Sequence, residues 1–189
     1  MINEKLTDGL HWFPMRVTYA RELIAKQFLD SIGVECFIPM HYELVEGHHP
    51  RTQKLCPAVR NLIFVRSTQE QITEMKMTRR EMAPVRYMMR PVRDEKGNVV
   101  RHEIIIVPDH QMENFLRVAS VSDDRIFFLD NLRFAGRPGQ RVRVTAGDFA
   151  GVEGIIKRVK KSKRVVVQIE HVAAVAIAFL PSAYLEPIA

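Results

Sequence analysis

The chain has 189 residues, 47% of them hydrophobic, and carries a net charge of +6. This length suits two small domains, and the hydrophobic content argues against wholesale disorder. Two cysteines are too few for the disulfide framework of a small secreted protein, and the polar N-terminus does not resemble a signal peptide. No apolar run approaches the ~20 residues of a membrane-spanning helix. We therefore expect a soluble, cytoplasmic protein with no membrane partner.

The basic residues gather in two places. Residues 76–101 hold eight Lys and Arg against three acids, and residues 136–189 hold nine against four. Two such clusters indicate contact with a polyanion. Surface charge that meets only solvent explains clusters of this size equally well.

The N-terminal two thirds of the chain alternate between strand and helix patterns. Strands are predicted over residues 11–18, 34–40, 62–65, 85–89 and 104–107, from their short apolar runs. Helices are predicted over residues 21–31, 68–80 and 109–120, from apolar residues at helical spacing. Together these elements predict a compact α+β sandwich in which helices flank a small sheet.

Turn-forming and capping residues refine this reading. Pro14 predicts that the first strand is an edge strand or an irregular one. Gly33 stands where a helix C-cap is expected, and Thr68 where an N-cap is expected. The polar residues 41–60 indicate a long loop or a loose hairpin, and residues 94–98 indicate a turn.

Residues 136–139, Gly-Arg-Pro-Gly, are the strongest boundary signal in the chain. Beyond them, β-branched runs separated by turn residues predict strands over residues 142–145, 154–159, 165–169 and 172–179. Closely spaced strands of this kind predict a small β-barrel. The expected organisation is an N-terminal tail (1–10), an α+β domain (11–120), a linker (121–138) and a β-barrel domain (139–189).

The first predicted hairpin of the barrel contains a glycine-rich turn. Gly147 and Gly151 tolerate the tight curvature that such a turn needs, and Phe149 between them is either tucked back as a plug or displayed to a partner. Gly154 begins the next strand at a place where a side chain would obstruct close backbone approach. The hairpin over residues 157–164 is strongly basic, and its lysines either meet RNA or, as we favour, form a solvated tip.

The segment 139–159 resembles the KOW motif of NusG-family and certain ribosomal proteins, with glycine, aromatic and apolar positions all coinciding. Most of residues 11–120 resemble the N-terminal domain of the NusG family. The resemblance rests on Trp12, the strand over residues 34–40 that ends near Pro39, the strand over 62–65 and Val107-Pro108. One departure is Arg60-Asn61-Leu62, where the family usually has Pro-Gly-Tyr or Pro-Asn-Tyr.

The resemblance implies an NGN-type α/β sandwich followed by an SH3-like KOW β-barrel, in a non-enzymatic transcription elongation factor. In the family, the N-terminal domain lays an apolar concavity on the clamp coiled coil of the largest RNA polymerase subunit. An apolar groove that accepts helices is physically reasonable for such a contact. The matching polymerase-binding candidates are Leu62, Phe64, Met112 and Phe115. Each of these residues is equally well explained as core.

Nucleic acid and a second protein are the other partners that the resemblance implies. The candidates for sequence-independent phosphate contact with upstream DNA or nascent RNA are Arg79, Arg80, Arg86, Arg90 and Arg93. In the family, the KOW domain recruits a ribosomal protein or a termination factor. The corresponding partner-binding candidates are Phe149, Gly147 and Gly151. We expect a monomer without a cofactor.

Within the family, the spacing from Trp12 to Met40 resembles that of specialised, operon-specific antiterminators, which often serve long surface-polysaccharide operons. Some members of that branch hold the KOW segment as a helical hairpin that masks the polymerase site. The β-branched strands of this chain favour the barrel, and only residues 171–180 suit a switch to helix.

Two other functions compete with this reading. Five soft or imidazole ligands occur in one region, at Cys36, His41, His48, His49 and Cys56, which raises the possibility of a metal-dependent enzyme. Their spacings match no zinc pattern, and the chain carries none of the common catalytic motifs. The second alternative is a ribosome-bound or RNA-binding KOW protein, which has no need of a polymerase-binding half.

Overall fold

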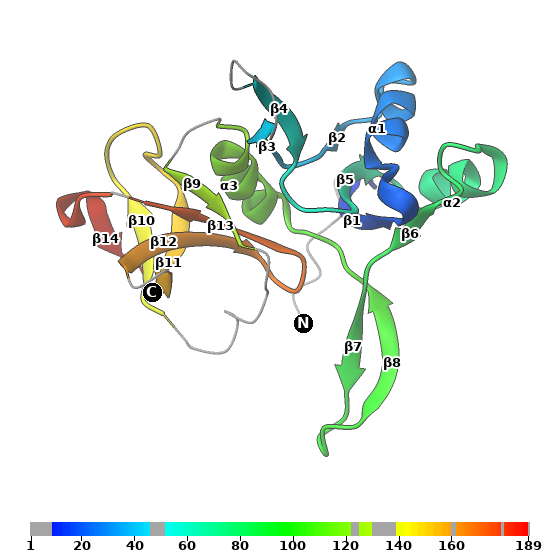
Figure 1. Cartoon of the computed structure of the whole chain (residues 1–189). Helices are drawn as coiled ribbons and strands as arrows, with labels where there is room; N and C mark the ends of the chain where they lie inside the picture. The colour runs from blue at the N-terminus through cyan, green and yellow to red at the C-terminus, as the bar shows by residue number, and fades with distance from the viewer. Residues whose placement is uncertain are drawn as a thin grey trace. The chain divides into compact units, whose positions relative to one another are not determined.

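The computed structural model describes residues 9–45, 52–121, 125–129, 139–159, 162–178 and 180–188. The chain divides into two compact units (Figure 1). Unit 1 comprises Met1–Ile38 and Arg60–Asp109, and unit 2 comprises Pro39–Val59 and His110–Ala189. The described residues contain both helices and many strands, which confirms the predicted α+β class.

Unit 1 is built on a four-stranded antiparallel sheet with the order β2-β5-β1-β6. Its strands are β1 (His11–Val17), β2 (Cys36–Phe37), β5 (Leu62–Ser67) and β6 (Val85–Tyr87). The two central strands, β1 and β5, are buried along most of their length. Burial on both faces explains why their sequences are nearly continuous apolar runs and do not alternate with polar residues.

Proline in the first strand predicted an edge or irregular strand, but β1 lies inside the sheet, between β5 and β6. Pro14 is tolerated because the β6 ladder ends beside it. Its carbonyl accepts a hydrogen bond from Met88 N at 3.3 Å, whereas the Met88 carbonyl accepts from Ile105 N at 3.0 Å. Pro14 has no N–H to donate to the Met88 carbonyl that faces it, but Ile105 N donates to that carbonyl instead.

The two helices of unit 1 have the caps that the sequence predicted. Helix α1 (Glu22–Ser31) follows the short 3-10 turn η1 (Thr18–Ala20), and it contacts β2 and β5. Its end is a Schellman motif: Gly33 has φ +72° and donates to Asp30 O, while Val34 donates to Leu29 O. Helix α2 (Gln69–Thr78) begins after Thr68, whose side chain accepts a hydrogen bond from Gln71 N.

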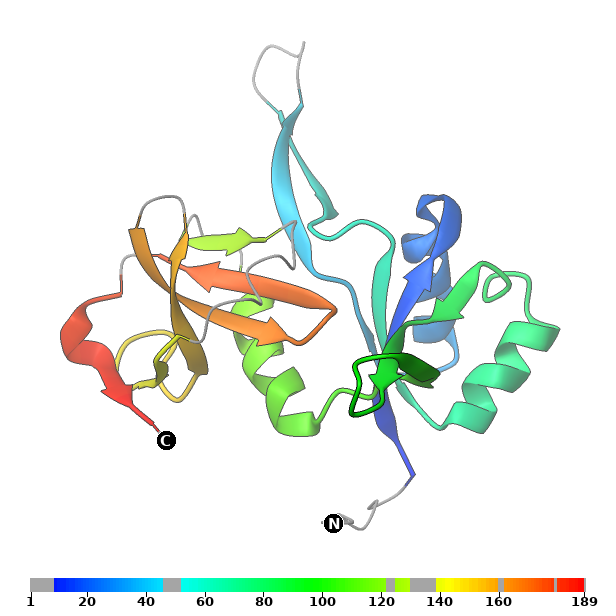
Figure 2. The same ribbon diagram turned by 90° about the horizontal axis from the view of Figure 1, so that it is seen from below.

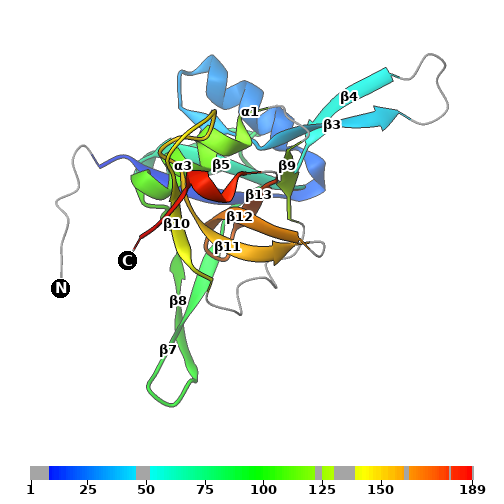
Figure 3. The same ribbon diagram turned by 90° about the vertical axis from the view of Figure 1, so that its left-hand side faces the viewer.

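A second, two-stranded sheet in unit 1 is formed by β7 (Met89–Arg93) and β8 (Val99–Ile104). This hairpin extends away from the four-stranded sheet (Figures 1 and 3). The strand predicted over residues 104–107 overlaps β8 only at Ile104, because the rest of β8 precedes it. Nearly all side chains of the hairpin are exposed, so no apolar alternation marks these strands in the sequence.

Unit 2 begins with the hairpin of β3 (Met40–Val45) and β4 (Thr52–Pro57), which confirms the loose-hairpin alternative for residues 41–60. Helix α3 (Asp109–Ala119) belongs to unit 2 from His110 onward. Its buried side chains, Met112, Phe115, Val118 and Ala119, follow the helical spacing from which the helix was predicted.

The rest of unit 2 is a six-stranded antiparallel sheet with the order β14-β10-β11-β12-β13-β9. Its strands are β9 (Ile126–Phe128), β10 (Arg141–Val144), β11 (Glu153–Val159), β12 (Ser162–Ile169), β13 (Ala173–Ile177) and β14 (Leu185–Pro187), the last preceded by the 3-10 turn η3 (Ser182–Tyr184). The four strands predicted for the β-barrel domain correspond to β10–β13. All five residues of β13 are buried, as a continuous apolar run predicts.

The outer strands β9 and β14 were not predicted, because three residues are too few to show a period. β9 lies in the range expected to be a linker, and it pairs with β13 (Figure 2). Phe127 and Leu129 pack there against a buried cluster that includes Val166 and Ala174. The boundary residues 136–138 lie outside the described part of the chain.

Candidate functional site

The four apolar candidates are all buried. Leu62 and Phe64 lie on β5 with 3% and 0% of their surface exposed. Phe64 stands between Pro14 of β1 and Phe37 of β2 in the sheet register. Met112 and Phe115 lie on α3 and are both fully buried. In this structure, these side chains are buried and present no accessible apolar face.

The five arginine candidates are all exposed, and all lie in unit 1. Arg79 and Arg80 directly follow α2, Arg86 lies on β6, and Arg90 and Arg93 lie on β7. Arg90 forms an ion pair with Glu103 at 3.3 Å, and Arg93 donates to Gly97 O at 2.8 Å. The two arginines of the hairpin therefore already have local partners.

Arg86 lies in a strongly basic environment. It stands directly opposite Arg16 in the register between β1 and β6, and both side chains are exposed. Burial is the main cause that lowers the pKa of the nearby Lys76, and the positive charge of Arg86 lowers it further. The Arg86 guanidinium is held in place by hydrogen bonds to the carbonyls of Ala83 and Val85. Like charges directly opposite each other destabilise a sheet, so this arrangement favours an anionic ligand.

The glycine-rich turn between β10 and β11 tucks its aromatic residue inward. Phe149 is only 1% exposed, and the Arg125 guanidinium lies 5.4 Å from its ring centroid. Gly147 and Gly151 have φ of +79° and +86°, the left-handed region that glycine enters without strain. The sequence left open whether Phe149 is tucked back as a plug or displayed to a partner, and in the structure it is tucked back. Its ring shapes the turn from within.

Helix α3 is hydrogen-bonded to this turn within unit 2. Arg117 Nη1 donates to the carbonyl of Ala150 at 3.0 Å, and Asn114 Oδ1 accepts from the backbone N–H of Glu153 at 3.1 Å. A Cβ on Gly151 would lie 2.9 Å from Arg117 Nη1. The glycine thus serves both the curvature of the turn and its approach to α3.

Comparison with protein-family models gives two matches. Residues 10–116 match the family described as transcription termination factor nusG, and residues 138–170 match the KOW motif. The first match alone covers more than half of the chain. The chain belongs to the NusG family. Members of this family are transcription factors and not enzymes. No curated protein sequence matches the chain.

The departure of this NusG-family chain at Arg60-Asn61-Leu62 has a structural role. Asn61 has φ +62°, and its carbonyl accepts a hydrogen bond from Val17 N at 2.9 Å. Its side-chain Oδ1 accepts from Ala20 N at 3.2 Å, and its own N–H donates to Glu22 Oε1 at 3.3 Å. Asn61 therefore joins the end of β1, the η1 turn and the start of α1.

The η1 turn contains functional candidates that the sequence did not reveal. Tyr19 and Ala20 have φ of +64° and +51°, a region that costs a non-glycine residue energy. Tyr19 is 85% exposed, the highest value among the large apolar side chains of the described residues. No pattern of residue types signals backbone strain of this kind, because neither residue is one that favours positive φ.

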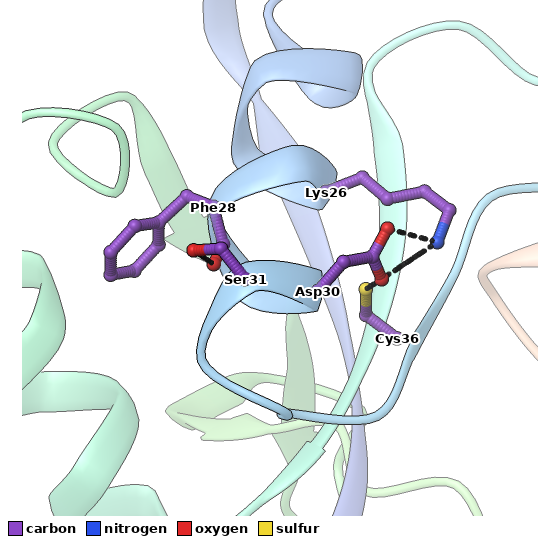
Figure 4. A network of polar contacts seen from close by, with 5 residues as sticks. All are labelled: Lys26, Phe28, Asp30, Ser31 and Cys36. Carbon is purple, nitrogen blue, oxygen red and sulfur yellow. Dashed lines mark hydrogen bonds and ion pairs between the residues drawn. The ribbon is translucent and has the colours of Figure 1, made fainter.

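The region proposed as a possible metal site contains a different arrangement (Figure 4). Asp30 accepts hydrogen bonds from Lys26 Nζ at 2.9 Å and from Cys36 Sγ at 3.4 Å. Burial is the main cause that raises the pKa of the Cys36 thiol to about 12, and the Asp30 hydrogen bond adds to it. A thiol kept protonated is a poor metal ligand.

The other members of that possible metal site do not extend this arrangement. Cys56 is a free thiol on β4, and His41 on β3 pairs with Glu43 at 2.9 Å. His48 and His49 lie outside the described residues. Across the described part of the chain, no group of three or more His, Cys, Asp or Glu could hold a metal ion. No helix there is long and apolar enough to cross a membrane.

Proposed function

We propose that this NusG-family protein binds RNA polymerase at the clamp coiled coil of the largest subunit and promotes processive elongation and antitermination. The observation that carries the proposal is the NusG family match over residues 10–116, followed by the KOW motif. A ribosomal KOW protein has no need of the first part. The protein acts in the cytoplasm as a monomer, and it needs no cofactor.

The polymerase contact is proposed for the region around Leu62, Phe64, Met112 and Phe115. Because all four side chains are buried in the free chain, polymerase reaches them only if binding uncovers them. The apparent affinity for polymerase is then reduced in proportion to the fraction of molecules in which these residues are accessible. Polymerase should therefore increase hydrogen exchange in the segments that cover these residues.

The exposed arginines supply the nucleic-acid contact of the proposal. Arg79, Arg80 and Arg86 lie near the end of α2 and on β6, and Arg90 and Arg93 extend along β7. Guanidinium groups pair with phosphates without reading the sequence, which suits a factor that stays on the template through elongation. The contact is proposed for upstream DNA or nascent RNA.

The glycine-rich turn is the proposed site for a ribosomal protein or a termination factor. Phe149 is the internal support of this surface, and Gly147 and Gly151 set its curvature. The targets proposed for the whole protein are specific long operons, such as surface-polysaccharide loci. This last step rests on the spacing from Trp12 to Met40 alone.

A read-through assay tests the proposal. Wild-type protein is added to core RNA polymerase transcribing through a terminator, and read-through should increase. Phe64→Leu and Phe115→Leu keep an apolar side chain in the core, so they should fold while lowering read-through. Met77→Gln on α2, where Met77 is 77% exposed, serves as the matched control and should act as wild type.

A pull-down decides between this function and its nearest alternative. Binding to core polymerase supports the proposal. Binding to ribosomes or RNA without polymerase would replace it with the alternative of a ribosome-bound KOW protein. Equal read-through with wild type and both Phe→Leu variants would remove these two residues from the contact.

A further inference from the structure

We propose that Cys56 on the β3–β4 hairpin is a reactive thiol, which His41 and Glu43 activate for exchange with small disulfides. The site goes beyond the transcription function proposed above, because it is a place of covalent modification and uses neither polymerase nor nucleic acid. Its ligand class is a low-molecular-weight disulfide, and its product is a mixed disulfide on unit 2.

The three side chains share one face of a two-stranded sheet. β3 and β4 pair antiparallel, and His41 stands directly opposite Cys56 in their register (Figure 3). Directly opposite residues project to the same face, with Cβ atoms about 4.5–5.5 Å apart. Glu43 is two residues beyond His41 on β3, so it belongs to that face as well. The register therefore places a thiol, an imidazole and a carboxylate side by side.

The carboxylate determines which nitrogen of the neutral imidazole is the base. His41 Nε2 lies 2.9 Å from Glu43 Oε1. An ionised carboxylate only accepts hydrogen bonds, so Nε2 carries the proton of the neutral ring and donates to it. Nδ1 then has a free lone pair. In this arrangement a carboxylate orients a histidine that serves as base for a nearby nucleophile.

The basic nitrogen of His41 has no partner of its own. Nδ1 is buried and forms no hydrogen bond with any described residue. Most buried polar atoms are hydrogen-bonded, so an exception needs an explanation. The Cys56 thiol is attached to its backbone through a single rotatable side-chain bond, and rotation about χ1 brings it toward the ring that faces it. Contacts between a nucleophile and its base are often looser in sites without ligand.

The site is open to a small reagent. Cys56 is half-buried, and the side chains of His41 and Glu43 are 35% and 54% exposed. Lys54 on β4 stands opposite Glu43 and is exposed, so it adds a positive charge to the same face. A thiolate is stabilised next to a protonated histidine or a lysine. The charges that face the His41–Cys56 pair on this hairpin are thus one carboxylate and one ammonium group.

The exchange balances without a further reactant. His41 Nδ1 takes the thiol proton of Cys56, and the thiolate attacks one sulfur of the small disulfide. A new S–S bond forms to Cys56 while the bond within the small disulfide breaks. The departing thiolate then takes the proton from His41. Cys56 is oxidised, and the departing half of the disulfide is reduced.

The other cysteine of the chain has the opposite environment. Cys36 lies in unit 1 and donates a hydrogen bond from its thiol to Asp30 Oδ1 at 3.4 Å (Figure 4). Burial is the main cause that raises the pKa of this thiol to about 12. The thiolate is the nucleophile, so Cys36 should react slowly near neutral pH. Both cysteines are half-buried, and they differ in that one faces a base and the other a hydrogen-bond acceptor that keeps its proton in place.

Reaction with two small disulfides tests the site in the full-length protein. Dithionitrobenzoate releases a coloured thiolate and reports the rate, and oxidised glutathione reports the mixed disulfide by intact mass. Near neutral pH, Cys36→Ser should keep the fast reaction of wild type. Cys56→Ser should lose it and react only slowly through Cys36.

The role of His41 is measured in the Cys36→Ser background, where Cys56 alone reacts. At about pH 7 an ordinary cysteine is only about 3% thiolate, so complete proton transfer raises the reactive fraction about 30-fold. The lower nucleophilicity of a more acidic thiol takes back part of that gain. His41→Gln keeps an N–H for Glu43 but removes the base. It should slow the reaction by roughly 3- to 30-fold near neutral pH.

Two further variants separate activation from folding. His102→Gln is the matched control, because His102 is an exposed histidine on β8 of the other two-stranded sheet and stands opposite Pro91. It should react as its parent. Glu43 is a positioning residue, so Glu43→Gln should shift the pH profile of the rate toward that of His41→Gln. At about pH 10 an accessible thiol is ionised without help, so all variants that retain Cys56 should react alike there.

Fast reaction of Cys56 that His41→Gln slows near neutral pH, but not at the high pH, supports the site. The site is refuted if Cys36→Ser and Cys56→Ser react at the same rate, or if His41→Gln reacts as its parent near neutral pH. Equal slowing at both pH values also refutes it, because the substitution would then have changed access to Cys56. These measurements need no polymerase, so a negative result leaves the proposed polymerase contact intact, and a failed pull-down leaves this site intact.

Discussion

Gly154 on β11 packs closely against the neighbouring strand β12. A Cβ built at this position would lie 2.7 Å from Val165 Cγ1 and 2.9 Å from the carbonyl oxygen of Val166 on β12. Val165 is 2% exposed and β-branched, so its side chain has little room to rotate. The carbonyl belongs to the sheet backbone and yields only if β11 and β12 separate.

The expected effect of Gly154→Ala follows from two opposing contributions. Overpacking a rigid site costs about 1–3 kcal/mol. Alanine recovers roughly 0.4–1 kcal/mol because it restricts the unfolded chain more than glycine does. The net destabilisation of unit 2 is therefore about 1–2 kcal/mol, which lowers its melting temperature by roughly 5–15 °C for a domain of this size.

Two optical signals separate the units in a thermal melt. Trp12 lies in unit 1, so its fluorescence follows that unit, while far-UV circular dichroism follows the whole chain. The variant should shift the dichroism transition and leave the Trp12 transition unchanged. Met77→Gln is the control and should leave both transitions unchanged, because Met77 is 77% exposed on α2 of unit 1. If Gly154→Ala showed the same dichroism transition as wild type, the close approach of β11 to β12 at Gly154 would not require glycine.

Three further predictions concern α2, Cys36 and the contact between α3 and the glycine-rich turn. Thr68→Ala should destabilise unit 1 by about 1 kcal/mol in urea unfolding, because α2 loses its N-cap, whereas Thr68→Asn should not. The raised pKa of Cys36 means that the folded state keeps its thiol proton from pH 9.0 to about 12 while the unfolded state loses it. This group's contribution to stability should therefore fall as pH rises through that window, and Cys36→Ser should remove the loss. Gly151→Ala should expose α3 amides to hydrogen exchange, since φ +86° disfavours alanine and the new Cβ displaces Arg117 from Ala150 O; unchanged exchange would contradict the role given to Gly151.

The elements that could be predicted are those in which the local pattern and the burial agree. β13 was predicted from an apolar run, and every residue of that strand is buried. Gly154 was predicted as a site of close approach, and the Cβ distances confirm it. Thr68 and Gly33 were predicted as caps, and both cap their helices. In each case one residue type has one dominant physical reason to occupy its place.

Prediction failed where the pattern carries no burial signal. The β7–β8 hairpin is held by backbone pairing between two exposed strands, and its side chains are those of a loop. Pro14 is accepted inside the sheet because of hydrogen bonds that involve Met88 and Ile105, and both residues are far from Pro14 in the sequence. Apolar periodicity places Phe64 and Phe115 on a buried face, but it cannot state whether that face meets the protein's own core or a partner.

The turn at Tyr19 illustrates which local features are hardest to find from a single sequence. A sequence specifies its fold when propensity, pattern and turn chemistry agree, and natural proteins break that agreement mainly at functional sites. Tyr19 and Ala20 break it, because their positive φ is imposed by Asn61 and by the buried Glu22. Stability alone would favour glycine at such a position. An exposed tyrosine in this strained turn is therefore a feature that no pattern of residue types reveals.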